Sequence, residues 1–333
     1  MAPGGTSDSG EAMIRAALIV IALAVAAVAG LGAGYVLWSK KEINWYAADI
    51  NKLGPGPEND LIRYGKDLIV NTAVHIGKKA TDPALRYAGN DLSCQNCHLN
   101  AGLQPFAAPF ISTFATFPMM VDDQVLTLTG RLNGCMRRSL NGKDLPPDSR
   151  EMQALVAYIK FVGTGTPEGV RLPGMGLKPI QPPALPPDSR RGQEVYAKSC
   201  AKCHKDDGQG ELKASPGVGY SIPPLWGEAS FNAGAGMAKI AYAASYIQSN
   251  MPFGISYVDL VLTVQQAWDV AAYIDGKPRP QDPRYTGSVE QTRQKFHDTA
   301  QSMYGKTVDG VLLGGDGPPK PAPSAGAIGG RSG

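Results

Sequence analysis

The sequence predicts a mainly α-helical protein in which two tandem domains of similar design follow one N-terminal hydrophobic helix. Two observations predict the pair of domains. A Cys-x-x-Cys-His motif occurs at Cys94–His98 and again at Cys200–His204, and each copy lies between two segments with helical patterning. A third observation, an uncharged apolar run over residues 16–38, predicts the N-terminal helix. At 333 residues, the chain has the length of two domains with extensions.

The repeated motif is that of covalent haem c attachment. In each copy the two thiols add to the haem vinyl groups, and the adjacent histidine supplies an axial nitrogen to the iron. The residues concerned are Cys94, Cys97 and His98 in the first copy and Cys200, Cys203 and His204 in the second. The alternative is a pair of zinc knuckles, but these would need further Cys or His ligands at characteristic spacings, which the chain lacks. We therefore expect two covalently attached haem c groups.

Composition and the haem motifs together indicate partners and compartment. The net charge is only +3, so we expect no nucleic-acid partner. Glycine and proline are abundant, with 40 and 27 residues, as in small loop-rich domains whose cofactor fills much of the core. Because haem is attached to this motif outside the bacterial cytoplasm, we expect the domains in the periplasm. Cys135, the fifth cysteine, is then single in an oxidising compartment, where metal ligation would protect it.

The N-terminus is expected to anchor the chain. Residues 1–15 are small and polar and are predicted to be disordered, whereas residues 16–38 are long enough to cross a bilayer, and Trp38 with the lysines after it resembles an interfacial anchor. The positive-inside rule would place these lysines in the cytoplasm, but haem attachment requires the rest of the chain in the periplasm, and this decides the orientation. The alternative is a signal peptide cleaved after Ala27-Val28-Ala29, which would give a soluble periplasmic protein.

In the first domain, a helix is expected over Leu61–Ile69. About twenty additional residues separate this helix from the haem motif. After the motif, apolar residues recur every three or four positions from Met152 to Ile159 and predict a second helix, capped by Asp148 or Ser149.

In the second domain, helices are expected over Arg190–Tyr196, capped by Asp188 or Ser189, and over Trp268–Ile274. The order helix, haem motif, loops, helix resembles the class I cytochrome c domain, in which the first and last helices cross beside the haem. The predicted fold is therefore mainly α, with two tandem class I cytochrome c-like domains and an N-terminal transmembrane helix.

The expected divisions of the chain are a disordered N-terminus (1–15), the anchor (16–38), a spacer (39–60), the first domain (61–171), a proline-rich semi-rigid linker (172–187), the second domain (188–285) and a C-terminal extension (286–333). The extension is expected to contain an amphipathic helix from about Val289 to Met303 and to be disordered from about residue 314.

The sixth iron ligand distinguishes an electron carrier from a catalytic centre. For the second haem, Met251 has the placement usual in His/Met cytochromes, in a loop and followed by proline. Met237 is the alternative, and Met251 would otherwise only fill the core. For the first haem, Met119 and Met120 follow a proline rather than preceding one, and they are poorer candidates.

Cys135 is the expected distal ligand of the first haem. Arg131, Arg137 and Arg138 would lower its pKa and favour the thiolate, which is both the ligand and the nucleophile. Together with Ser139 they are expected to bind a small oxyanion. The alternatives are an inert buried cysteine and a solvated basic face. Thiolate ligation lowers the haem potential, so electrons would pass from the first haem to the second. A sulfur nucleophile, a redox iron and an anion pocket indicate oxidised sulfur compounds as substrates.

Three segments together resemble the dihaem thiosulfate dehydrogenases: Gly89–Gly102, Arg131–Gly142 and Pro224–Met237. The resemblance spans about residues 60–280 and includes the cysteine ligand. It implies an enzyme that couples two thiosulfates into tetrathionate and releases two electrons, a reaction that some members run in reverse. The N-terminal anchor departs from the soluble periplasmic members of the family.

Carried over to this chain, the resemblance makes the haem of His98 and Cys135 the catalytic centre and the haem of His204 and Met251 the electron relay. Thiosulfate would dock on the arginines and Ser139, Cys135 would form a transient adduct with its terminal sulfur, and a second thiosulfate would release tetrathionate. The electron acceptor would be a cytochrome c or a membrane-bound respiratory component.

Two other functions are consistent with the sequence. The chain would otherwise be a non-catalytic dihaem electron-transfer cytochrome, or a cysteine-ligated haem subunit of a multi-protein sulfur-oxidation system. A dihaem peroxidase is disfavoured, because it needs an open distal position and this chain offers a ligand there.

Overall fold

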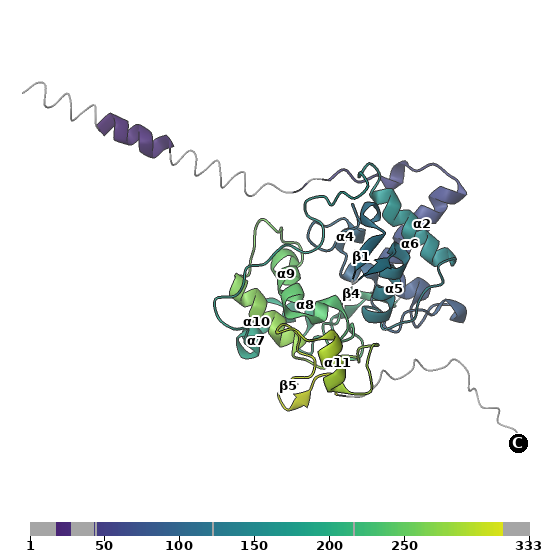
Figure 1. Cartoon of the computed structure of the whole chain (residues 1–333). Coiled ribbons are helices and arrows are strands. Elements are labelled where there is room, and N and C mark those ends of the chain that lie inside the picture. The colour runs from purple at the N-terminus through teal and green to yellow at the C-terminus, as the bar shows by residue number, and fades with distance from the viewer. Residues whose placement is uncertain (1–17, 28–42, 44, 122, 216, 316–333) are drawn as a thin grey trace, which may run out of the picture. The chain divides into compact units, whose positions relative to one another are not determined.

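Helices make up most of the regular structure in the computed structural model (Figure 1), which describes residues 18–27, 43, 45–121, 123–215 and 217–315. The α-helices from Trp45 onward are α2 (Pro57–Val70), α3 (Thr72–Ile76), α4 (Leu99–Gly102), α5 (Leu128–Arg138), α6 (Arg150–Val162), α7 (Ser189–Ser199), α8 (Ala201–His204), α9 (Ile240–Asn250), α10 (Val264–Asp275) and α11 (Val289–Phe296). Single turns of 3-10 helix lie at Ile50–Lys52, Pro83–Leu85, Cys94–Asn96, Phe114–Thr116 and Gly236–Ala238. The predicted mainly α fold is confirmed.

Strands are short and form antiparallel pairs. The pairs are β1 (Met119–Val121) with β2 (Gln124–Leu126), β3 (Glu211–Leu212) with β4 (Tyr220–Ile222), and β5 (Thr307–Val308) with β6 (Val311–Leu312). The first two pairs lie in loops between helices, the third follows α11, and none contributes a sheet to the core.

The chain up to Asn44 forms one unit, and the chain from Trp45 onward forms a second unit. In the first unit, residues 18–27 are helical, and their large apolar side chains are 59–65% exposed. Among the described residues, no helix is both long and apolar enough to span a membrane. Residues 16–17 and 28–38 of the predicted anchor lie outside the described residues. The N-terminus predicted to be disordered and the tail from residue 316 lie outside them too.

The first predicted domain is built on the crossing of α2 and α6. The two helices touch at Gly65, where a Cβ atom would lie 2.0 Å from the carbonyl oxygen of Ala154. Only glycine permits this approach of two backbones. Leu68 and Tyr158 are buried beside the crossing. The hydroxyl of Ser149 accepts a hydrogen bond from the third residue of α6 at 3.2 Å, which confirms the predicted cap.

The second domain repeats this crossing with α7 and α10. At Gly192 a Cβ atom would lie 2.0 Å from the carbonyl oxygen of Asp269, and Tyr273 packs there as Tyr158 does in the first domain. Asp188 caps α7, as predicted. The Arg191 guanidinium adds two hydrogen bonds of 2.8 Å to the Asp269 carboxylate. The repeated glycine crossing is the structural basis of the similarity between the two halves of the sequence.

The predicted linker, residues 172–187, is irregular but is bound to both halves. In the first half, the backbone N–H of Phe106 donates to the carbonyl of Gly174 at 2.8 Å. In the second half, the indole of Trp268 donates to the carbonyl of Gln181 at 2.9 Å. The linker is therefore a packed layer between the halves rather than a spacer.

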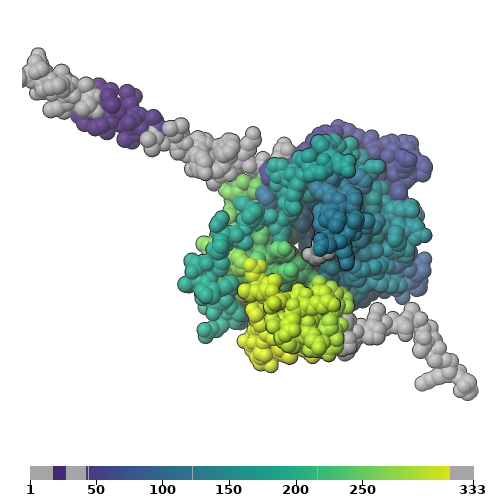
Figure 2. Space-filling model, viewed as in Figure 1, coloured from purple at the N-terminus to yellow at the C-terminus, as the bar shows by residue number. Residues whose placement is uncertain are grey.

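The C-terminal extension packs onto the second half (Figure 2, yellow). The N–H of Ile240 at the start of α9 donates to the carbonyl of Gln301 at 3.1 Å. Within the extension, α11 ends at Phe296 rather than at the predicted Met303. It ends there because the next side chain, His297, turns inward to bond the buried carboxylate of Asp282 at 2.8 Å.

The helix crossing gives a test of the fold. Replacing Gly65 with alanine should lower the free energy of unfolding of the haem-loaded protein by about 2–3 kcal/mol, because the new methyl group overlaps the Ala154 carbonyl. Urea unfolding measures this change. Gly54→Ala is the matched control, since nothing lies within 4 Å of its added Cβ atom, and it should change stability by less than about 0.5 kcal/mol. Equal stability of the two variants would contradict the crossing.

Candidate functional site

One face of α5 carries Arg131, Cys135 and Arg138, because helical positions three and four apart lie above one another. Arg137 does not share this face. Its Nη1 atom lies 2.6 Å from the carboxylate of Asp144, and Arg137 does not line the cavity described below. The structure therefore corrects the sequence prediction, which grouped Arg137 with the other two arginines, since a residue two positions from Cys135 points to a different side of the helix.

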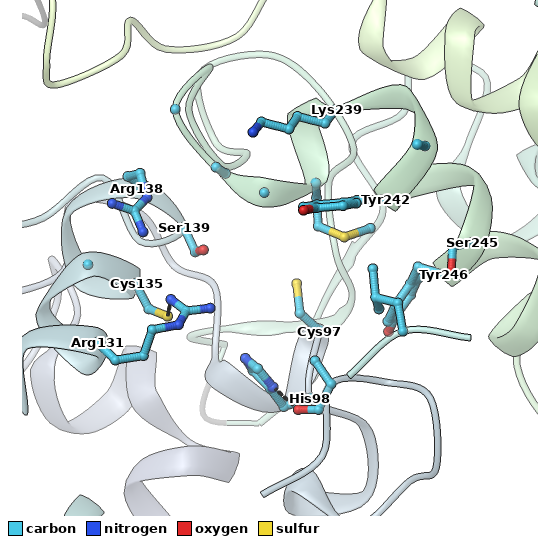
Figure 3. Close-up of a pocket in the computed structure, with 18 of the residues that line it drawn as sticks. Cys97, His98, Arg131, Cys135, Arg138, Ser139, Lys239, Tyr242, Ser245 and Tyr246 are labelled. Atoms are coloured by element: carbon cyan, nitrogen blue, oxygen red, sulfur yellow. Dashed lines mark hydrogen bonds between the residues drawn. The ribbon is translucent and has the colours of Figure 1, made fainter. Parts of the chain in front are cut away.

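A cavity of about 740 Å³ lies against this face of α5. Figure 3 shows Arg131, Cys135, Arg138 and Ser139 on one side of the cavity and side chains of α9 on the other, with Cys97 and His98 between the two groups. Its remaining walls come from the linker, the loop before α9 and the C-terminal extension; the residues are Arg171, Leu177, Lys178, Pro179, Ile180, Ala233, Gly234, Ala235, Gly236, Met237, Arg284, Phe296 and His297. Both halves of the chain thus enclose one site.

Cys135 differs electrostatically from the cysteines of the first haem motif. Burial acts to raise its pKa, but the nearby His98 ring and the guanidinium groups of Arg131 and Arg138 lower the pKa to about 7. The Arg131 Nη1 atom donates to the Cys135 sulfur at 3.1 Å. By contrast, burial raises the pKa of Cys94 to about 11. Cys135 is therefore the cysteine of this site whose thiolate form is favoured.

The two motif histidines are oriented alike, as iron ligation requires. The Nδ1 atom of His98 lies 2.6 Å from the carbonyl oxygen of Ala108, and that of His204 lies 2.9 Å from the carbonyl oxygen of Pro223. A carbonyl can only accept, so Nδ1 carries the proton in each ring and Nε2 keeps its lone pair for a metal. Phe110 packs against the His98 ring at 4.7 Å and fixes its plane.

The cavity also offers a polar partner for a cofactor. The hydroxyl oxygen of Tyr246 is buried and has no hydrogen-bond partner within the described part of the chain, and burial raises its pKa well above the usual value. A neutral buried hydroxyl normally donates to some group. With His98 and Cys135 close together on the wall of the cavity, the residues present fit a haem held through Cys94 and Cys97.

At the second motif, Cys200 and Met251 pack against the same apolar core, and Met251 is the residue that ends α9. Met237, the alternative ligand for this haem, also packs against this core, and it lines the cavity that contains His98 as well. Met119 and Met120, the alternatives for the first haem, lie on β1 with 37% and 66% of their surface exposed and do not line the cavity.

Several residues of the cavity were not predicted from the sequence. Tyr246 lies in a helix with no distinguishing pattern, and Arg284 and His297 lie beyond the segments that carry the haem motif. Lys178, in the predicted linker, donates from Nζ to the carbonyl of Tyr257 at 2.8 Å. The one available signal was the apolar character of Leu177 and Ile180 within the predicted proline-rich linker.

Asn232 attaches the second half of the chain to the end of α5. Its backbone N–H donates to the carbonyl of Arg138 at 3.1 Å, and its side-chain Nδ2 donates to the carbonyl of Arg137 at 2.9 Å. The side chain of Asn141 donates in turn to the carbonyl of Ser230 at 2.9 Å. The last carbonyls of a helix have no partner within the helix, and here a neighbouring domain supplies one.

Comparison with known families agrees with this site. The family model described as "SoxA/TsdA, cytochrome c domain" matches residues 86–167, and the model described as "Cytochrome c" matches residues 189–277. With one haem motif in each match, the protein is a dihaem c-type cytochrome that carries two covalently attached haem c groups.

Similar whole proteins identify the family. A thiosulfate dehydrogenase of Thiomonas intermedia is 40% identical over 292 residues, which cover 85% of this chain and 88% of that protein. A thiosulfate dehydrogenase of Stutzerimonas stutzeri is 40% identical over 77% of this chain and 80% of its own length. The solved structure of thiosulfate dehydrogenase (TsdBA) from Marichromatium purpuratum matches with a TM-score of 0.75 and 35% identity, over 84% of this chain but only 59% of that one. The chain belongs to the thiosulfate dehydrogenase family.

The contact of Asn232 with α5 gives a second prediction. Asn232→Leu should lower the free energy of unfolding by about 1–3 kcal/mol, because it leaves the Arg137 carbonyl without its donor. It should also shift the electron paramagnetic resonance g-values of the first haem, because the helix that carries Cys135 is released. Asn59→Ala is the control, since Asn59 makes only an exposed hydrogen bond. Unchanged stability and unchanged g-values would contradict this role of Asn232.

Proposed function

We propose that this protein oxidises thiosulfate and joins two thiosulfate ions into tetrathionate, with transfer of two electrons to an acceptor. The observation that carries the proposal is the Cys135 sulfur, which lies beside the motif histidine His98 in the cavity and receives a hydrogen bond from Arg131 at 3.1 Å. Its relatives named thiosulfate dehydrogenase support the choice of substrate.

Thiosulfate is a dianion, and the α5 face suits it. The guanidinium groups of Arg131 and Arg138 and the hydroxyl of Ser139 supply donors for a sulfonate on the same side of the cavity as Cys135. Bound there, the anion presents its terminal sulfur to the Cys135 sulfur. Arg137, paired with Asp144, has no part in this binding.

The proposed reaction has two steps at Cys135. In the first, a bond forms between the Cys135 thiolate sulfur and the terminal sulfur of thiosulfate, and two electrons leave. In the second, the terminal sulfur of another thiosulfate attacks the sulfur joined to Cys135, the bond to Cys135 breaks, and tetrathionate leaves with the thiolate restored. The first step is an oxidation and the second is an exchange without net oxidation.

The charges of the site assist both steps. Each step brings a thiosulfate dianion toward a group that is already negative, and Arg131 and Arg138 reduce the repulsion. A bound haem c supplies one-electron uptake for the electrons released. Because every step is reversible, the same residues would also cleave tetrathionate when electrons are supplied.

We propose that His204 and Met251 hold the haem that passes electrons outward. In support, Met251 directly follows the last residue of α9 and packs against the same apolar core as Cys200. A thioether ligand raises a haem potential and a thiolate ligand lowers it, so the second haem is the better electron acceptor. The final acceptor would be a cytochrome c or a membrane-bound respiratory component.

We propose the domain boundaries 61–171 and 188–285, with the linker 172–187 between them, which the two family matches support. We also propose that residues 16–38 anchor the protein on the periplasmic side of the bacterial inner membrane. The apolar sequence supports this, as does the 59–65% exposure of the large apolar side chains of the helix at 18–27, since such surface is stable in lipid.

The role of Cys135 can be tested with two substitutions. Cys135→Gly should abolish thiosulfate-dependent reduction of an artificial electron acceptor, while mass spectrometry still finds both haems attached. Cys135→Met keeps a sulfur at this position but cannot form the adduct, and it should be equally inactive.

Arg137→Gln on the same helix is the matched control. It breaks only an exposed ion pair, so its kcat/KM should stay within about twofold of the unsubstituted protein. Turnover by either Cys135 variant would refute the proposed mechanism, and inactivity of the Arg137 variant would refute the assignment of roles on α5.

Membrane attachment is tested by cell fractionation. Haem staining should find the full chain in the membrane fraction, and replacing residues 1–38 with a cleavable signal peptide should move it to the soluble periplasm. A mature soluble protein that begins near Gly30 would show that the segment is a signal peptide instead.

A further inference from the structure

Arg284 is an arginine that lines the cavity but does not belong to α5. It lies in the segment that follows α10, the last helix of the second domain. Its guanidinium is held by a buried carboxylate: Nε and Nη2 donate to Asp282 at 3.0 and 2.7 Å. Asp282 is fully buried and also accepts from His297 at 2.8 Å. Phe296 packs against the guanidinium at 4.3 Å. The side chain is therefore fixed in one orientation before any ligand binds.

The fixed orientation leaves one edge of Arg284 available. Its Nη1 atom has no hydrogen bond within the described part of the chain, and 37% of the side chain is exposed. Both carboxylate oxygens of Asp282 accept hydrogen bonds. A Cβ atom added at Gly234 would lie 2.8 Å from the carboxylate carbon, so the loop at Gly234 covers the negative charge. An anion in the cavity meets the donor edge of Arg284 and not the carboxylate.

Arg284 also lies near the arginines of α5. Arg138 lines the same cavity, and the charge of Arg284, after burial, is among the causes that lower the pKa of Arg138. No ion pair joins Arg138 to a carboxylate within the described part of the chain, and an anion bound beside it would compensate its charge. Arg131, Arg138 and Arg284 thus present three cations to one cavity.

The other cations of the cavity are less suited to such an anion. Lys178 donates to the carbonyl of Tyr257 at 2.8 Å, and Arg171 donates to the carbonyl of Met175 at 3.3 Å. Lys239 lies over the ring of Tyr242 at 5.7 Å, on the α9 side of the cavity.

We propose that Arg284 binds the second sulfonate: that of the second thiosulfate as it attacks, and the far end of tetrathionate as product or substrate. The inference rests on the proposed function. Tetrathionate has a sulfonate at each end of three S–S bonds of about 2 Å each, so its two ends need separate cations. Arg131 and Ser139 hold the end next to Cys135, and Arg284 holds the other end. A single thiosulfate needs only the first of these places.

Binding measurements on the haem-loaded protein test this assignment. Isothermal titration calorimetry in a Cys135→Gly background gives the Kd of tetrathionate and of thiosulfate, because neither ligand can react without the Cys135 sulfur. Arg284→Gln should raise the Kd of tetrathionate about tenfold, the effect of losing one charge-assisted hydrogen bond, and should change the Kd of thiosulfate less than about twofold. Arg284→Lys keeps a charge and an ion pair with Asp282, and should raise the Kd of tetrathionate about threefold.

Arg293→Gln is the matched control, since Arg293 lies on the same extension, pairs with Glu290 and does not line the cavity. It should leave both Kd values unchanged. If Arg284→Gln does not fold, the lysine variant decides the question alone. The proposal is overturned if tetrathionate binds the Arg284 variants as tightly as it binds the unsubstituted protein, or if both ligands weaken equally. It is also overturned if only the reduction potential of the first haem shifts, since Arg284 would then pair with the haem.

The two proposals fail separately. An unsubstituted protein that does not turn over thiosulfate refutes the proposed function. Normal turnover together with unchanged tetrathionate binding in the Arg284 variants refutes only the second subsite.

Discussion

The hydrogen bonds from Asn232 to the last two carbonyls of α5 hold the cavity together, because they tie the helix that carries Cys135 to the other half of the chain. Behind Asn232, Gly234 lies against the buried carboxylate of Asp282. His98 and Cys135 both belong to the first half, and the second half closes the cavity around them. Neither half alone contains all the walls of the cavity, and its residues act only when both are in place.

Much of the fold follows from local rules that act over a few residues. The haem motifs, the helix caps at Ser149 and Asp188 and the apolar stripe of α6 are short-range patterns, and the structure has each of them. The crossing at Gly65 and Gly192 could also have been predicted, since a glycine occurs at the same place in each first helix. Docking of the linker could not, because the carbonyls of Gly174 and Gln181 accept from groups distant in sequence, and a carbonyl leaves no pattern in the side chains of the linker.

The candidate site was predictable where it lies on one helix and not where it depends on tertiary contacts. A helical projection of α5 already places Arg137 on a different face from Arg131 and Arg138. Tyr246 and Arg284 reach the cavity from elements distant in sequence, and only the tertiary structure brings them there. The low pKa of Cys135 combines both kinds of information, since Arg131 and Arg138 are neighbours in sequence whereas His98 is not.

The sharing of the cavity between distant segments bears on how the protein is made. A chain is synthesised N-terminus first, so Cys94 and Cys97 leave the ribosome before Arg284 and His297 do. The segment that carries Arg284 is the last wall of the cavity to be made. A chain truncated before it would keep both cysteines of the first haem motif but would leave the cavity beside Cys135 without one of its walls.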